Sequence, residues 1–126
     1  MTTLDRRSLL AGATGTAFVA ALPASAAAPT AAGALVDALD QRDSALAIGR
    51  EVLAQQPGLS ADVLVAELAR AVALPPGRLA RMDRELLRAR LDAARSAEFG
   101  RADTVRVRGW VLAASEARLC ALVALA

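Results

Sequence analysis

Apolar residues recur three, four or seven positions apart over most of the chain, which is the spacing of one helix face. In residues 34–56 this spacing predicts a first helical segment, which Pro57 and Gly58 end. Gly49 weakens this segment, and a break near Asp43-Ser44 would divide it into two helices. Its apolar face consists of Leu35, Leu39, Leu46, Val52 and Leu53.

A second helix is expected between Ser60 and the run Pro75-Pro76-Gly77. Ser60 is a favourable N-cap residue, because its hydroxyl can accept from a free backbone N–H of the first turn. Asp62 places a negative charge in that turn, where the helix dipole favours it. The apolar face of this helix is marked by Leu64, Leu68 and Val72.

The third helical segment, residues 79–99, separates its polar and apolar faces most clearly. At 100° per residue, apolar side chains fill one arc and charged side chains fill the opposite arc. Acidic and basic residues alternate on the charged arc, so we expect a solvated face rather than a basic binding stripe. The expected intrahelical pairs are Arg81 with Glu85 and Arg88 with Asp92.

Asp83 and Arg90 break this pattern, because both project into the apolar arc. One interpretation is a partly buried ion pair, or a polar contact with another segment. The other is that Asp83 caps a helix that begins at Arg84, while Arg90 buries its stem and keeps its charge in water. We favour the cap. We do not expect a functional site here, since structural ion pairs also perturb charged groups. Gly100 ends the helix.

Residues 104–113 have the pattern of a β-hairpin. The segments Thr-Val-Arg-Val and Trp-Val-Leu-Ala are rich in strand-forming residues, and Arg108-Gly109 lies between them. Arg108 is a poor residue for a two-residue turn, and the alternative is one extended strand that pairs with another chain. An isolated hairpin is marginal, so this one must pack on the helices. A two-residue turn creates one apolar face, with Val107 opposite Trp110 and Val105 opposite Leu112.

A last helix of about 11 residues is expected to begin at Ala114 or Ser115, and it is apolar on nearly all sides. It is shorter than the roughly 20 residues that span a bilayer, so it is either the central core helix or a surface that a partner covers. These patterns predict a mainly α domain of three to four helices, with a short β-hairpin at about 104–113 before the last helix. The expected partner surface consists of Trp110, Leu119, Leu122 and Val123.

Residues 1–26 follow the order of a secretory signal peptide. Two arginines precede an uncharged run of 14 residues, Leu9–Leu22, and small residues follow Pro23. An uncleaved membrane anchor is a secondary interpretation, because this run is short for a span. The export signal is marked by Arg6, Arg7, Leu9 and Leu10, and the cleavage site by Ala24 and Ala26.

This leader resembles the twin-arginine (Tat) class. Asp5 precedes the arginine pair and two leucines follow one position later, although Ala11 stands where a lysine is common. The alternative is an ordinary Sec signal, but a run that is only mildly apolar favours Tat. The resemblance implies the Tat translocase as a partner, and a periplasmic or secreted protein.

Cleavage after Ala26 would remove a signal peptide of residues 1–26. The mature chain would then consist of a disordered linker, residues 27–33, and one small helical domain, residues 34–126. Of 15 basic and 13 acidic residues in the chain, cleavage removes Asp5 and two arginines. The remaining 13 basic and 12 acidic residues give a net charge of +1. So low a charge gives no electrostatic reason to expect a nucleic-acid partner.

The residue types that carry most enzyme chemistry are missing. The chain has no histidine, no lysine and one cysteine, Cys120. We therefore expect no metal site, no cofactor and no catalytic residues, and a non-enzymatic protein. Because Cys120 lies among leucines, we expect a buried core thiol rather than a reactive or intermolecular one.

The C-terminal stretch from residue 101 to 125 resembles the signature of a small, largely uncharacterised bacterial Tat-leader family. In that family a Gly-Trp hairpin runs into a Glu-Ala-Arg-Leu helix, and residues 44–53 belong to the same pattern. The resemblance implies no established activity. We expect an exported accessory or interaction protein that binds another exported protein. One such role is the small subunit of a periplasmic redox enzyme. The alternative is a stand-alone periplasmic structural or stress protein. The matching positions are Val105, Val107, Gly109, Trp110, Leu112, Glu116, Ala117, Arg118 and Leu119.

Overall fold

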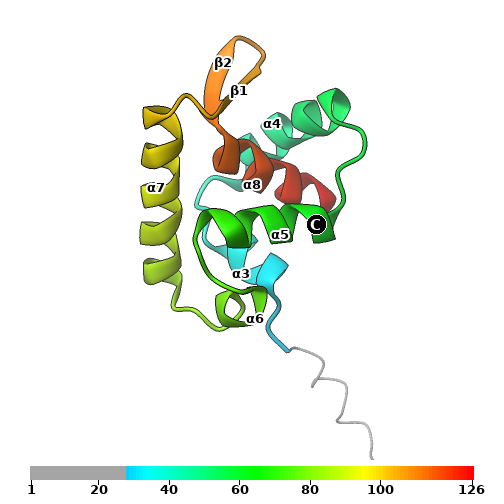
Figure 1. Cartoon of the computed structure of the whole chain (residues 1–126). Coiled ribbons are helices and arrows are strands. Elements are labelled where there is room, and N and C mark those ends of the chain that lie inside the picture. The colour runs from blue at the N-terminus through cyan, green and yellow to red at the C-terminus, as the bar shows by residue number, and fades with distance from the viewer. Residues whose placement is uncertain (1–27) are drawn as a thin grey trace, which may run out of the picture.

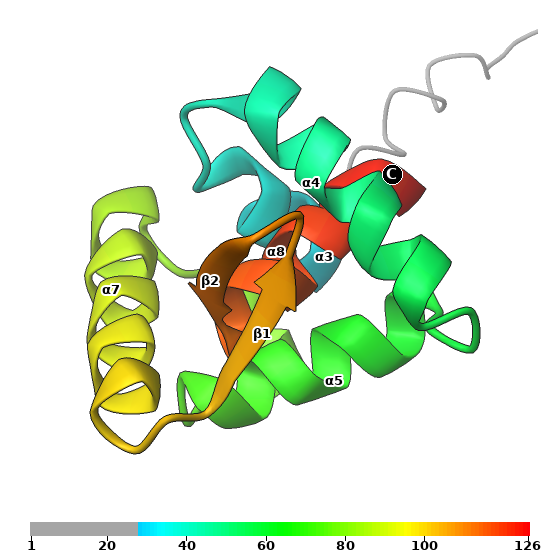
Figure 2. The same ribbon diagram turned by 90° about the horizontal axis from the view of Figure 1, so that it is seen from above.

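Helix α8 lies at the centre of the fold, and the other elements surround it (Figures 1 and 2). The computed structural model describes residues 28–126. It confirms a mainly helical domain with an antiparallel hairpin directly before the last helix. The elements are α3 (Ala31–Asp37), α4 (Arg42–Gln55), α5 (Ala61–Ala71), α6 (Pro76–Leu79), α7 (Arg84–Gly100), β1 (Thr104–Val107), β2 (Trp110–Ala113) and α8 (Ala114–Leu125).

The first helical segment is divided earlier than the sequence pattern indicates. The chain leaves the helix after Asp37 and re-enters it at Arg42, whereas we expected the break near Asp43-Ser44. Asp40 lies in the intervening loop, where it pairs with two arginines of α7. These contacts between distant segments are invisible to local periodicity. With the short α6, the break raises the number of helices in the described residues to six.

The expected disordered linker, residues 27–33, overlaps a helix at its C-terminal end. Residues 31–33 form the first turn of α3, and the Oγ atom of Thr30 accepts a hydrogen bond from the backbone N–H of Gly33 at 3.0 Å. Thr30 is therefore an N-cap that the sequence analysis missed. The apolar face of α3 supplies the reason for ordering, because Leu35 and Val36 are buried in the core.

Two other helix starts are confirmed with their caps. The Oγ atom of Ser60 accepts from the N–H of Val63 at 3.2 Å at the start of α5. A carboxylate oxygen of Asp83 accepts from the N–H groups of Glu85 and Leu86 at the start of α7. Asp83 is thus a cap and not the ion-pair partner of Arg90. Arg90 instead makes the other expected contact, with another segment, because its guanidinium donates to the backbone carbonyl of Val72 at 3.1 Å.

Helices α5 and α7 end in the same way, because an alanine with a left-handed backbone lies two residues after the last residue of each helix. Ala73 has φ 59° and Ala102 has φ 58°. After α5, the N–H of Leu74 donates to the carbonyl of Ala69, which is the closing bond of a Schellman motif. After α7, the N–H of Asp103 donates to the carbonyl of Glu98. This second motif turns the chain sharply into β1.

The core is made of leucines from different helices, gathered on α8. The large side chains that are fully buried include Leu35, Leu64, Leu68, Leu79, Leu87 and Leu122. Helices α4 and α8 pack closely in this core, where Gly49 lies against the backbone of Cys120. A β-carbon at Gly49 would overlap the carbonyl oxygen of Cys120, so the glycine permits the crossing.

No helix within residues 28–126 is long and apolar enough to cross a membrane. The expected export-signal residues Arg6, Arg7, Leu9 and Leu10, and the cleavage residues Ala24 and Ala26, lie outside the described residues.

Candidate functional site: the hairpin groove

The hairpin has the strand register that the sequence predicts. Val107 pairs with Trp110 and Val105 with Leu112. Arg108 and Gly109 form the two-residue turn, with φ values of 52° and 84°. Both values are positive, as in a type I′ turn, and an arginine adopts such a conformation only at a cost. The extended-strand alternative is therefore wrong.

An ion pair holds this turn over α4. The Nε atom of Arg108 lies 3.3 Å from a carboxylate oxygen of Glu51. Both side chains are partly exposed, so the pair contributes little to the free energy of unfolding. It does fix the tip of the hairpin beside one face of α4.

The hairpin and α4 enclose an apolar groove of about 290 Å³. Trp110 stands at this groove with 72% of its surface exposed, the largest exposed fraction among the bulky apolar side chains of residues 28–126. An exposed tryptophan beside an apolar hollow is typical of a protein-binding surface. We call this feature the hairpin groove; its lining is Ala47, Ile48, Val107, Arg108, Trp110 and Leu112.

The expected partner surface is only partly present. Trp110 is exposed, but Leu119 is 6% exposed and Leu122 is 1% exposed, so neither adds an exposed apolar surface beside Trp110. Val123 is partly buried against the core. The reason is that α8 is the central core helix, the first of the two alternatives that its apolar sequence left open. The structure places the groove on residues of α4 instead.

Cys120 is buried in α8, as the sequence predicts. Burial, and to a smaller extent the charge of Glu116, raises the pKa of the thiol to about 11. The thiol therefore stays protonated at neutral pH and is a poor nucleophile.

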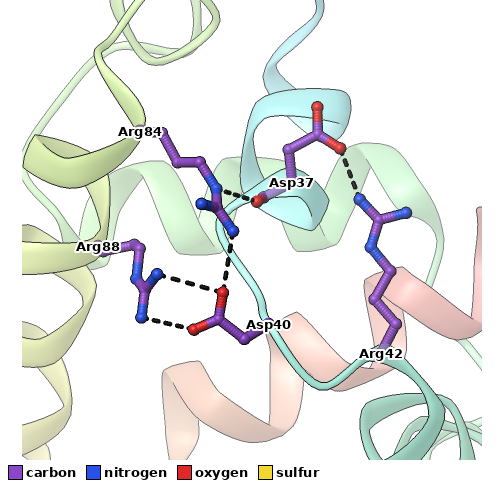
Figure 3. Close-up of polar contacts among 5 residues, drawn as sticks. All are labelled: Asp37, Asp40, Arg42, Arg84 and Arg88. Carbon is purple, nitrogen blue, oxygen red and sulfur yellow. Dashed lines mark hydrogen bonds and ion pairs between the residues drawn. The ribbon is translucent and has the colours of Figure 1, made fainter.

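A cluster of ion pairs and hydrogen bonds joins α7 to the loop between α3 and α4 (Figure 3). Asp40 accepts from Arg84 at 2.9 Å and from Arg88 at 2.7 Å. The Nε atom of Arg84 also donates to the backbone carbonyl of Asp37 at 2.7 Å. The expected pair of Arg88 with Asp92 is replaced by these contacts, because Asp40 comes within reach only in the folded chain. We call this feature the α7 arginine cluster.

A cleft of about 310 Å³ lies next to the α7 arginine cluster. Its charged side chains satisfy one another. Arg95 lies 3.4 Å from a carboxylate oxygen of Asp92 and 3.7 Å from one of Glu116. Its apolar walls include Leu91 and Leu119. The charged side chains along this cleft are therefore engaged in ion pairs with one another.

One buried carboxylate escaped the sequence analysis. Glu98 is 2% exposed, and one of its oxygens accepts from the backbone N–H of Ser115 at 2.8 Å and from its hydroxyl at 2.7 Å. These bonds tie the end of α7 to the start of α8, across the base of the hairpin. Ser115, as the donor of both bonds, has a structural role here.

Within residues 28–126, no group of three or more histidine, cysteine, aspartate or glutamate side chains is placed to hold a metal ion. The hairpin groove, with the exposed Trp110 beside it, is the candidate site that we take from the described residues. Comparison of the chain with protein-family models, with curated proteins and with solved structures found no match.

Proposed function

We propose that the chain is an exported, non-catalytic interaction protein that binds another exported protein through the hairpin groove. The observation that carries this proposal is the exposure of Trp110 beside an apolar hollow of about 290 Å³. Tryptophan is enriched among the residues that dominate the energy of protein interfaces. The groove offers space for one large apolar side chain of a partner, with Trp110 as its outer wall.

The Tat-like leader supports a partner that is also exported from the cytoplasm. The Tat route carries folded proteins, so a partner could be bound before export, as the small subunit of a periplasmic redox enzyme would be. The absence of histidine and lysine from the whole sequence argues that any cofactor of such a complex belongs to the partner.

Export is tested first. The full chain is expressed in a bacterium with its own leader, and the protein is located by fractionation. The Arg6→Lys/Arg7→Lys double variant should remain in the cytoplasm, because the Tat route requires the arginine pair. Undiminished export of this variant would place the protein on the Sec route.

Partner binding is tested by affinity purification of the exported protein from the periplasm. The wild-type chain should retain one stoichiometric protein, and Trp110→Ala should lose it. Val63→Ala is a matched control, because Val63 is an exposed apolar residue on α5, away from the groove. Recovery of the wild-type chain alone would contradict the proposal and favour a stand-alone structural or stress protein.

A further inference from the structure

The outer edge of β2 is a second unpartnered feature of the hairpin. In a hairpin with a two-residue turn, the pair next to the turn is hydrogen-bonded and the following pair is not. Val107 and Trp110 form the first pair, so the backbone N–H and C=O of Val111 point away from β1. No group within residues 28–126 forms a hydrogen bond with them. The hairpin projects beyond the helical body (Figure 1), and Val111 is 46% exposed, so the edge is accessible at this residue, although β2 is the strand on the side of α7 (Figure 2).

The two edges of the hairpin differ in charge. The strand β1 carries Arg106, and charged side chains on an edge oppose the addition of another strand. The strand β2 has the sequence Trp-Val-Leu-Ala and carries no charge. Val111, the register partner of Arg106, is 46% exposed. Only the β2 edge therefore combines free backbone groups with uncharged, strand-forming side chains.

We infer that β2 pairs antiparallel with β2 of a second copy of this chain, about a twofold axis at Val111. The free N–H and C=O of Val111 are then each paired with those of Val111 in the second copy. Trp110 lies opposite Leu112 of the second copy, on the same sheet face, and covers it. Two marginal hairpins become one four-stranded sheet.

The charges around the hairpin fit this arrangement. In the antiparallel register, the turn of one hairpin lies beside the base of the other. Arg108 in the turn therefore approaches the base, where Asp103 and Glu116 supply negative charge. Within one chain Asp103 lies 3.6 Å from Arg101 and Arg108 lies 3.3 Å from Glu51, and all four side chains are partly exposed, so the contact between copies would exchange these pairs for a pair of Arg108 with Asp103. Opposite charges at both ends of a twofold contact specify the antiparallel register.

Self-association is tested by sedimentation equilibrium of the full chain over a range of concentrations. The protein should have twice the monomer mass at high concentration. Val111→Pro removes the N–H that the second copy would use, but no bond within the hairpin. It should weaken association about tenfold or more. Arg106→Pro is the matched control on the other edge, and it should leave association intact. A monomer at every concentration, or equal loss in both variants, would overturn the inference.

A cross-linking experiment gives a second readout for which folding is not in doubt. Cα atoms that face each other across the axis lie about 5.5 Å apart, within the range of a disulfide. Val111→Cys should therefore form a covalent dimer with oxidised glutathione, while Arg106→Cys should not. Cys120 is buried and should not react. Absence of the Val111→Cys dimer would contradict the proposed register.

The outcome is separable from the proposed function. The Val111 side chain projects to the sheet face opposite that of Trp110, and it does not line the hairpin groove. Val111→Pro should therefore retain a protein partner that Trp110→Ala loses. Retention of that partner by a purely monomeric wild-type chain would reject the inference and leave the proposed function standing.

Discussion

Helix α4 takes part in two contacts of opposite character. Gly49 lies against the backbone of α8, so closely that no side chain fits between the helices. Just before Gly49 in the sequence, Ala47 and Ile48 line the hairpin groove, where space of about 290 Å³ stays open. The first contact is buried and continuous with the core, whereas the second is open and apolar. The difference separates the part of the chain that stabilises the fold from the part that is free to bind.

The largest effect is expected at the closed contact. Gly49→Ala improves helix propensity by about 1 kcal/mol, but the new β-carbon overlaps the carbonyl oxygen of Cys120. Because the obstacle is backbone, no side-chain rotation relieves it, and we expect a net loss of about 2–3 kcal/mol. Chemical denaturation measures this loss. Gly100→Ala in α7 is the control, since open space surrounds it and its free energy of unfolding should not fall.

A smaller but clear loss is expected at the base of the hairpin. Glu98→Ala removes the acceptor of both Ser115 hydrogen bonds and leaves a buried N–H unpaired. We expect a loss of about 2 kcal/mol, against about 1 kcal/mol for Ser115→Ala. A double-mutant cycle measured by thermal unfolding should show coupling between the two positions. Additive losses would mean that the bonds between α7 and α8 do not act together.

Burial of the Cys120 thiol in the core should make the free energy of unfolding depend on pH. Its pKa is raised from 9.0 to about 11 in the folded chain, so folding keeps it protonated where the unfolded chain loses the proton. The free energy of unfolding should therefore decline between pH 9 and pH 11, by about 2–3 kcal/mol. The sequence has no lysine or tyrosine to titrate in this window. Denaturation curves of Cys120→Ala should lack the decline.

The smallest effect is expected in the α7 arginine cluster. Asp40→Asn removes the charge that pairs with Arg84 and Arg88, but these side chains are all partly exposed. We expect a loss of about 0.5–1 kcal/mol at low salt. High salt should reduce the loss, because it screens surface charges. A loss that is independent of salt would show that the cluster acts through packing.

The hairpin was predictable because its information is local. The alternation of Val105, Val107, Trp110 and Leu112 determines both the strands and the register, even though Arg108 is a poor turn residue. The cap at Asp83 was predictable for the same reason, since its partners are two and three residues away.

The remaining features depend on contacts between distant segments. Asp40 meets Arg88 across 48 residues, and Glu98 meets Ser115 across 17. The sequence pattern of α8 is equally consistent with a core helix and with a covered surface, because both require apolar residues all round. The groove was missed on the side of α4, since Ala47 and Ile48 resemble ordinary core positions. Only Trp110 identified the site from sequence.

The most direct test of the comparison uses two residues that face each other across the hairpin. Val107 is 1% exposed and Trp110 is 72% exposed, although they form one cross-strand pair. Denaturant unfolding of the single variants should show a loss of about 2 kcal/mol for Val107→Ala, and less than about 1 kcal/mol for Trp110→Ala. An equal or larger loss for Trp110→Ala would mean that this tryptophan stabilises the fold, and would contradict its assignment to a binding surface.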